Sequence, residues 1–144
     1  MKFSKHDLKM FNAAKKEAKK SEHHQYKIGC VIEYKGHIIG SGHNSHKTHP
    51  LQKEFNRFRN FKYSNNYSPD SLHAEIAAIC SVSYPVGINV KWNKVRVYVC
   101  RVRKDGKIAC SRPCKACMNY MRSLGIRKIF FTEDNNSYGY IEAQ

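Results

Sequence analysis

Four residues in this chain have the types and the spacing of a metal site with a proton carrier beside it. His73 and Glu75 are separated by one residue, and Cys114 and Cys117 form a Cys-x-x-Cys pair. One histidine and two cysteines supply three zinc ligands and leave the fourth tetrahedral position open for water, which is typical of a catalytic site. Glu75 is not needed as a ligand and can carry protons to and from that water.

Each half of this pattern has an alternative interpretation when it is taken alone. A Cys-x-x-Cys pair could be a redox pair or half of a structural zinc site, and His-Ala-Glu could be an ordinary helix start. The two halves together favour the metal site over these alternatives, because they occur in this order and each stands at the start of an apolar helical pattern; Pro113 before Cys114 selects this pair over Cys110. H-x-E followed by P-C-x-x-C is the signature of zinc-dependent deaminases. We therefore expect a hydrolytic enzyme with zinc as its cofactor.

The length and the hydropathy pattern favour one water-soluble domain. A chain of 144 residues can bury a core without disulfide bonds, so we expect a single deaminase domain over residues 1–144. Lys5 and Lys9 interrupt the N-terminal segment, and no apolar run approaches the length of a membrane span. The sequence therefore predicts a cytoplasmic protein that makes no membrane contact.

The charge of the chain is strongly positive. Its 26 Lys and Arg residues against 11 Asp and Glu give a formal net charge of +15. This charge would attract the phosphates of a nucleotide or of a nucleic acid. The alternative explanation is compositional, since scattered lysines usually form solvated faces.

The elements that must position the four residues can be read from the periodicity. Residues 4–20 predict an amphipathic helix with Ser4 and Asp7 as a capping pair. Residues 27–34 and 37–43 predict a hairpin around Lys35-Gly36, and residues 95–102, 128–132 and 138–141 predict three further strands. The sheet therefore has five predicted strands.

Two predicted helices carry the motif residues in their first turns. The first is capped by Ser71 and contains His73 and Glu75, and the second begins at Pro113 and ends at Gly125. Two helix N-termini aimed at one point would lower the pKa values of the cysteine thiols. We therefore expect both helices to build one site.

This order of elements and motifs resembles the cytidine deaminase superfamily over nearly the whole chain. The resemblance implies an α/β fold with three layers, α/β/α, and a five-stranded mixed sheet. It also implies that His73, Cys114 and Cys117 hold zinc and that Glu75 shuttles protons. The further implied partners are a small nucleoside or nucleotide and, as a homo-oligomer, other copies of the chain.

The resemblance also implies four substrate contacts. Asn44, at the end of the second predicted strand, corresponds to an Asn that binds the sugar in relatives, although a simple turn residue is the alternative. Backbone groups around Ala74 and around the turn that contains Ser111 and Arg112 are the implied candidates for holding the edge of the base.

The connection between the last two strands bears on the substrate. Residues 133–137 are too few for a helical crossover, so these strands should be antiparallel. Superfamily members that act on free cytidine are similar, whereas tRNA adenosine deaminases and many polynucleotide editors insert a helix there. Some bacterial DNA-targeting deaminase toxins also lack that helix. We expect deamination of cytosine in a free (deoxy)cytidine nucleoside or nucleotide; the alternative is cytosine or adenine within single-stranded DNA or RNA.

The insertion at residues 46–70 favours the alternative substrate. It interleaves Lys53, Arg57, Arg59 and Lys62 with aromatic residues, a composition suited to phosphate contacts and base stacking. The competing interpretation is an amphipathic helix behind Pro50 that packs on the core or on a second subunit.

Three histidines suggest a second metal site. His43, His46 and His49 are close in sequence, but such spacing in a loop is weakly specific, and Cys100 or Cys110 would have to join them.

Overall fold

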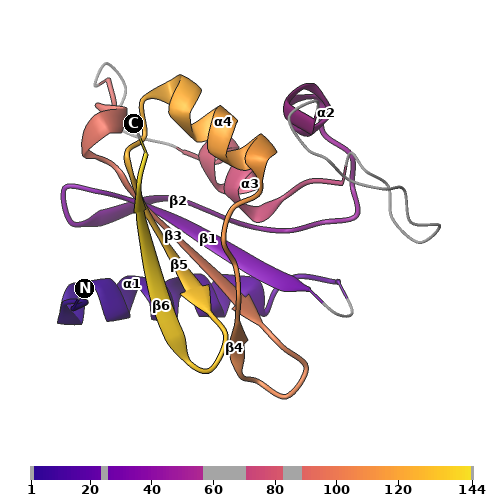
Figure 1. Ribbon diagram of the computed structural model, residues 1–144. Coiled ribbons are helices and arrows are strands. Elements are labelled where there is room, and N and C mark those ends of the chain that lie inside the picture. The colour runs from indigo at the N-terminus through magenta and orange to yellow at the C-terminus, as the bar shows by residue number, and fades with distance from the viewer. Residues whose placement is uncertain (1, 24–25, 57–70, 83–88, 144) are drawn as a thin grey trace.

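The computed structural model describes residues 2–23, 26–56, 71–82 and 89–143. They form three layers, with α1 on one face of a mixed sheet and α3 and α4 on the other (Figure 1). The predicted α/β/α fold is confirmed. The strands are β1 (Lys27–Tyr34), β2 (His37–His43), β3 (Arg96–Val102), β4 (Ile108–Ala109), β5 (Lys128–Glu133) and β6 (Ser137–Glu142). The helices are α1 (Lys5–Ala18), α2 (Pro50–Phe55), α3 (Ala74–Cys80) and α4 (Lys115–Leu124), with a 3-10 turn at Trp92–Lys94.

The sheet contains the five predicted strands and one short addition. Five strands follow the order β2-β1-β3-β5-β6. β3 and β5 are parallel, and β6 is antiparallel to β5, as the short connection predicted. The addition is β4, two residues long, which pairs with the end of β3 in a hairpin.

Two hairpins close through residues with positive φ. Lys35 and Gly36 have φ of 52° and 84° between β1 and β2, and Asn135 and Asn136 have φ of 62° and 58° between β5 and β6. Two successive residues of this kind match the right-handed twist of the flanking strands. The β5–β6 connection is therefore a tight turn with no room for a helix.

The helix caps agree only in part with the sequence. Ser4 and Asp7 form the predicted capping box of α1. Gly125 ends α4 in the left-handed conformation, as predicted. The predicted start of α3 at Ser71 is wrong, because Ser71 pairs with Thr48 in an isolated β-bridge and the helix starts after His73.

The predicted start of α4 is also wrong by two residues. Pro113 is not its first helical residue, because Cys114 is the N-cap and the helix starts at Lys115. His73 and Cys114 were expected inside the first turns of these helices, and each is instead the N-cap. A cap keeps an extended backbone, so both side chains leave the chain just before the helix.

The sheet buries an apolar core on each face. On the α3 and α4 side, alternate residues of β1 and β3 such as Cys30, Ile32, Val97 and Val99 pack with the two helices. On the α1 side, the intervening residues pack against an aromatic cluster. This period of two fixes which face each strand residue presents.

Gly42 allows α3 to lie directly on the sheet. A Cβ at this position would lie 2.5 Å from the backbone nitrogen of Ala78 and 2.7 Å from the carbonyl carbon of Ala77, both in α3. Such distances are shorter than any van der Waals contact, so only glycine lets β2 approach the helix backbone this closely. The helix that follows His73 is thereby held at its observed height above the sheet.

No helix within the described ranges is both long enough and apolar enough to cross a lipid bilayer.

We predict that Gly42→Ala lowers the free energy of unfolding by about 1–3 kcal/mol, because the added methyl group overpacks the contact with α3. Gly106→Asn is the matched control: open space surrounds Gly106, and asparagine tolerates its positive φ. Urea denaturation of both variants measures the difference. A Gly42→Ala variant as stable as the parent would show that the contact between β2 and α3 tolerates a methyl group.

Candidate metal centre

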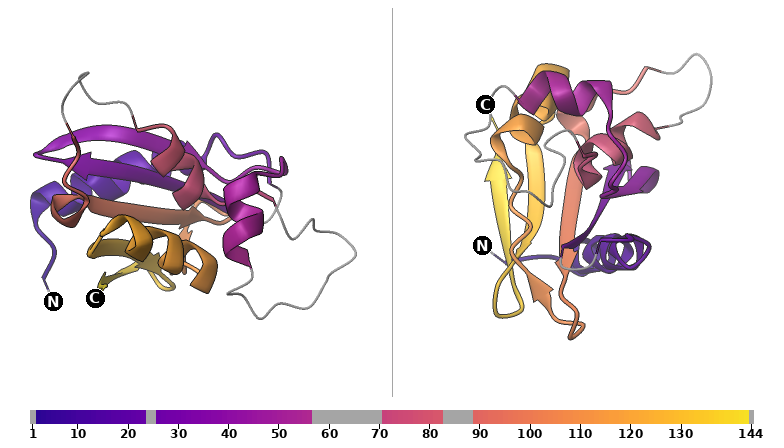
Figure 2. Two further views of the ribbon diagram at one scale, coloured as in Figure 1. Left: turned by 90° about the horizontal axis from the view of Figure 1, so that it is seen from above. Right: turned by 90° about the vertical axis from the view of Figure 1, so that its right-hand side faces the viewer.

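Three donor atoms meet where α3 and α4 begin. Nδ1 of His73 lies 3.5 Å from Sγ of Cys114 and 3.4 Å from Sγ of Cys117. His73 is the N-cap of α3, Cys114 is the N-cap of α4, and Cys117 lies in the first turn of α4. Figure 2 shows the two helices next to each other on the same face of the sheet. The structure thus brings together the three residues that the sequence predicted as ligands.

The spacing of these donors fits a zinc ion. Zinc binds thiolate sulfur at about 2.3 Å and imidazole nitrogen at about 2.0–2.1 Å, so a tetrahedral ion separates such ligands by about 3.6 Å. The distances of 3.4 and 3.5 Å from His73 Nδ1 are close to this value. Among the described residues, this is the one cluster of at least three His, Cys, Asp or Glu side chains with metal-ligand spacing. Three protein donors leave one coordination position for water.

A hydrogen bond couples the two cysteine thiols. The Cys117 thiol donates to Cys114, and this hydrogen bond is the main reason that the pKa of Cys114 falls to about 3. The same hydrogen bond, together with burial, raises the pKa of Cys117 well above its usual value. The first cause of both shifts is the hydrogen bond between the two thiols, so the prediction that the helix N-termini lower both pKa values stays a prediction. Zinc requires both sulfurs as thiolates, so its binding would release the remaining proton.

Glu75 lies in the first turn of α3, and its side chain is buried. Burial is the largest cause of the raised pKa of this carboxyl group; the neighbouring Cys114 raises it further, and His73 opposes the shift. A carboxyl group with a raised pKa is suited to accept a proton and to give it up again near neutral pH. This is the property that a proton shuttle beside the metal site needs.

A buried glutamine orients the segment of His73. Gln52, in α2, is fully buried, and its Oε1 accepts a hydrogen bond of 3.0 Å from the backbone nitrogen of His73. Its Nε2 donates to Oδ1 of Asn56 at 2.9 Å. Sequence reasoning missed Gln52, because hydropathy patterns do not predict a polar residue in a core. Its i, i+4 spacing to Asn56 behind a proline-started helix is the signal that was available.

The start of the 46–70 insertion packs on the core. His49 caps α2 by accepting from the backbone nitrogen of Leu51. Leu51 packs against the core, and the ring of Phe55 lies 5.0 Å from that of Tyr120 in α4. For residues 50–55 the amphipathic-helix interpretation is confirmed. Arg57, Arg59 and Lys62 fall outside the described residues.

The segment before Cys114 is tied to the ends of two strands. Oγ of Ser111 donates to the carbonyl of Val99 at 2.9 Å and accepts from the backbone nitrogen of Thr132 at 2.9 Å. The buried hydroxyl of Ser111 is engaged in these bonds, and the expected contact of the backbone of this turn with the base stays a prediction. Arg112 is exposed and its guanidinium lies 5.6 Å from the centre of the Phe131 ring.

The other two predicted substrate contacts are Asn44 and Ala74. The amide of Asn44 accepts from the backbone nitrogen of Ile28 at 3.0 Å and donates to the carbonyl of Tyr26. It therefore fixes the start of β1. Ala74 is fully buried as the first residue of α3.

The histidines that suggested a second metal each have a different partner. His43 pairs with Glu17 at 3.1 Å, His46 stacks on His23, and His49 caps α2. They do not form a cluster of donors among the described residues.

Comparisons with known proteins agree with this geometry. A sequence model described as the zinc-binding region of cytidine and deoxycytidylate deaminases matches residues 4–133. No curated protein sequence matches the chain significantly.

Solved structures with the same fold cover nearly the whole chain. The cytidine deaminase from Burkholderia pseudomallei has a TM-score of 0.60 at 17% identity, covering 98% of this chain and 94% of its own. The dCMP deaminase from the cyanophage S-TIM5 has a TM-score of 0.59 at 16% identity, covering 94% of this chain and 89% of its own. A mutant cytidine deaminase from Mycobacterium tuberculosis has a TM-score of 0.52 at 15% identity, covering 90% of this chain and 86% of its own. At such identities the likeness shows the fold.

We predict one tightly bound zinc ion per chain, because a histidine and two thiolates at this spacing complete three of its four tetrahedral positions. Elemental analysis of protein purified without chelators measures the content. The Cys114→Ser/Cys117→Ser double variant should lose the metal, whereas Cys80→Ser, which changes an exposed cysteine, should keep it. Unchanged zinc in the double variant would refute the assignment.

Gln52→Leu should weaken zinc binding by about 10-fold or more, as is typical when a group that orients a ligand is removed. Its control is Asn56→Leu, which removes the acceptor of Gln52 Nε2 but leaves Oε1 of Gln52 to accept from His73. Competition with a chromophoric chelator measures both affinities. If packing of α2 alone matters, the two variants will lose zinc affinity equally.

Proposed function

Since this chain belongs to the family of cytidine and deoxycytidylate deaminases with a zinc-binding region, we propose that it converts cytosine to uracil in a free (deoxy)cytidine nucleoside or nucleotide. The observation that carries the proposal is the buried Glu75 beside the three donors of His73, Cys114 and Cys117. This arrangement pairs a metal site that has an open position with a proton carrier, as a hydrolytic deamination requires.

Each residue has a role in the proposed reaction. His73, Cys114 and Cys117 would hold zinc, which acts as a Lewis acid and lowers the pKa of a water molecule toward neutrality. Glu75 accepts a proton from the attacking water and gives it to the ring nitrogen of cytosine. The water oxygen bonds to the amino-bearing carbon, and Glu75 then passes the second proton to the amino group. The carbon–nitrogen bond breaks, ammonia leaves and uracil remains.

The free substrate is favoured by the sheet edge. β6 is antiparallel to β5 across the turn at Asn135 and Asn136, which is the arrangement that resembles superfamily members acting on free cytidine. In addition, the described part of the insertion supports the core through Leu51 and Phe55.

A single-stranded nucleic acid is the second candidate substrate, because the formal net charge of +15 favours binding to phosphate backbones. For such an enzyme, neutralising Arg57, Arg59 and Lys62 would weaken binding of the strand and flatten its salt dependence. For a free substrate, the same changes leave turnover nearly unaltered.

We expect ammonia release and a uracil product from at least one free nucleoside or nucleotide in a panel that also contains single-stranded oligonucleotides. Glu75→Gln should keep its zinc and lose about 10²-fold to 10⁴-fold in rate, because the amide keeps the shape but cannot shuttle protons. Product mass, ammonia and zinc content are measured on both proteins. Product from oligonucleotides alone would refute the free-substrate proposal, and activity of Glu75→Gln within about tenfold of the parent would assign the protons to another group.

A further inference from the structure

We propose that Arg101 binds the phosphate of the substrate and makes the enzyme selective for a cytosine nucleotide over the corresponding nucleoside. The inference rests on the proposed function, because it adds a phosphate subsite to the same site. It follows from the face that Arg101 occupies, from its neighbours and from its unneutralised charge.

Arg101 belongs to the face of the sheet that carries the metal centre. On β3, Val97 and Val99 pack in the core that contains Ala74 and Cys117, whereas Tyr98, Cys100 and Val102 pack on the α1 side. Side chains alternate along a strand. The side chain of Arg101 therefore lies on the side of α3 and α4.

Cross-strand pairs place Arg101 just beyond the part of the sheet that packs under the metal centre. Val99 is paired with Cys30 of β1, and Arg101 is paired with Ile28. Val99 and Cys30 belong to the same core cluster as Ala74 and Cys117. Arg101 is thus one side-chain repeat, about 7 Å, further along the strand from that pair.

Hydrogen bonds tie this end of β3 to both segments that carry the ligands. The backbone nitrogen of Arg101 donates to Oγ1 of Thr132, and that hydroxyl also contacts Ser111 in the segment leading to Cys114. On β1, the backbone nitrogen of Ile28, the cross-strand partner of Arg101, donates to the side chain of Asn44. Ser45, which follows Asn44, donates its backbone nitrogen to the carbonyl of Leu72, the residue before His73. Arg101 therefore lies at the rim of the metal centre.

The guanidinium of Arg101 is half-buried and lacks an anion. Its Nε is buried without a hydrogen-bond partner among the residues that the structure describes, and no carboxylate in those ranges forms an ion pair with it. By contrast, Arg96 pairs with Asp7 and Arg103 pairs with Asp105. Burying a cation without a counter-charge is costly, so the local structure is suited to an anion that arrives from outside.

The chemistry of the position fits a phosphate monoester. The centre of the Tyr26 ring lies 4.2 Å from the guanidinium carbon of Arg101. This cation–π contact holds the guanidinium group in place. A guanidinium held flat presents a planar pair of donors that matches two phosphate oxygens. Tyr26 and Asn44 are joined through the backbone carbonyl of Tyr26, so the phosphate subsite adjoins the residue that the resemblance connects with the sugar.

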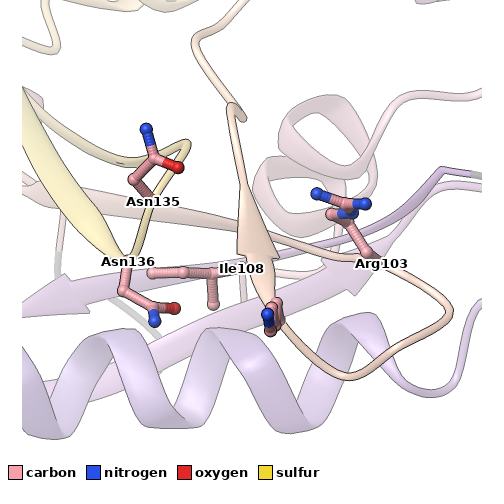
Figure 3. Close-up of a pocket in the computed structure, with 5 residues that line it drawn as sticks. Arg103, Ile108, Asn135 and Asn136 are labelled. Atoms are coloured by element: carbon pink, nitrogen blue, oxygen red, sulfur yellow. The ribbon is translucent and has the colours of Figure 1, made fainter.

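A second cationic position lies further from the metal centre. Arg103 and Lys107 line a pocket with Ile108, Asn135 and Asn136 between the β3–β4 and β5–β6 turns (Figure 3). Figure 1 shows these turns at the end of the sheet that points away from α3 and α4. Arg103 is exposed and already paired with Asp105. It is therefore the matched control for Arg101, with the same charge two residues further along the chain.

The test compares the parent, Arg101→Gln and Arg103→Gln on dCMP, CMP, deoxycytidine and cytidine, with zinc content checked in each protein. The parent should prefer a monophosphate to its nucleoside. Arg101→Gln should lower kcat/KM for the monophosphate by about 10-fold to 100-fold, mainly through KM, as expected for a lost charge-assisted hydrogen bond. Its effect on the nucleoside should be much smaller, and Arg103→Gln should change neither.

Binding of the products dUMP and UMP, measured by titration calorimetry, provides a readout that does not depend on turnover. It should weaken in Arg101→Gln to the level of deoxyuridine and uridine. Equal losses for nucleoside and monophosphate, unchanged product binding, or a loss seen in Arg103→Gln instead would overturn the subsite. If the parent deaminates nucleosides and monophosphates equally, the proposed function stands and the phosphate subsite falls. Turnover of oligonucleotides alone would overturn the proposed function, and product binding would still decide the role of Arg101.

Discussion

The site depends on one geometric constraint, the close meeting of donor atoms from two distant helix starts. His73 and Cys114 are 41 residues apart in sequence, yet Nδ1 and Sγ lie 3.5 Å apart. Three separate contacts maintain this distance. Gly42 sets the height of α3 above the sheet, Gln52 fixes the backbone of His73, and Ser111 ties the segment before Cys114 to β3 and β5. None of these residues is one of the three metal ligands, and each helps to set the distance between His73 and Cys114.

The opposite face of the sheet supports the two strands that lead into the site. β3 and β5 form the parallel pair, and their α1-facing side chains include Tyr98 and Phe130, whose rings stack with centres 4.5 Å apart. Phe11 of α1 contacts the Tyr98 ring edge-on, and Asp7 of α1 accepts a hydrogen bond of 2.6 Å from the Tyr98 hydroxyl. Packing on this face therefore fixes the relative position of the strand ends on which Arg101 and Thr132 lie.

Local periodicity predicted the order of strands and helices along the chain, the motif spacing predicted the donor triplet, and the resemblance to the cytidine deaminase superfamily implied the layers. Sequence reasoning placed the starts of α3 and α4 two residues too early, since Ser71 and Pro113 have good helix-start propensities that tertiary contacts override. Gln52 and the hydroxyl of Ser111 could not be predicted, because their partners, the backbone nitrogen of His73 and the carbonyl of Val99, are distant in sequence. Such bonds depend on a register that only the folded sheet defines.

The hydrogen bond between Ser111 and Val99 also joins the two ends of residues 100–110, so that these residues form a closed loop. After Val99 the chain forms the hairpin of β3 and β4 and returns to Ser111. The hydrogen bond of Ser111 to Val99 therefore positions the segment that leads to Cys114, and the length of the hairpin does not. The entropic cost of a longer loop grows only slowly with its length. We therefore expect changes of length at the Asp105-Gly106 tip, beyond Arg101, to leave the donor geometry unaltered, which makes this tip a place where the chain can vary without altering the metal centre.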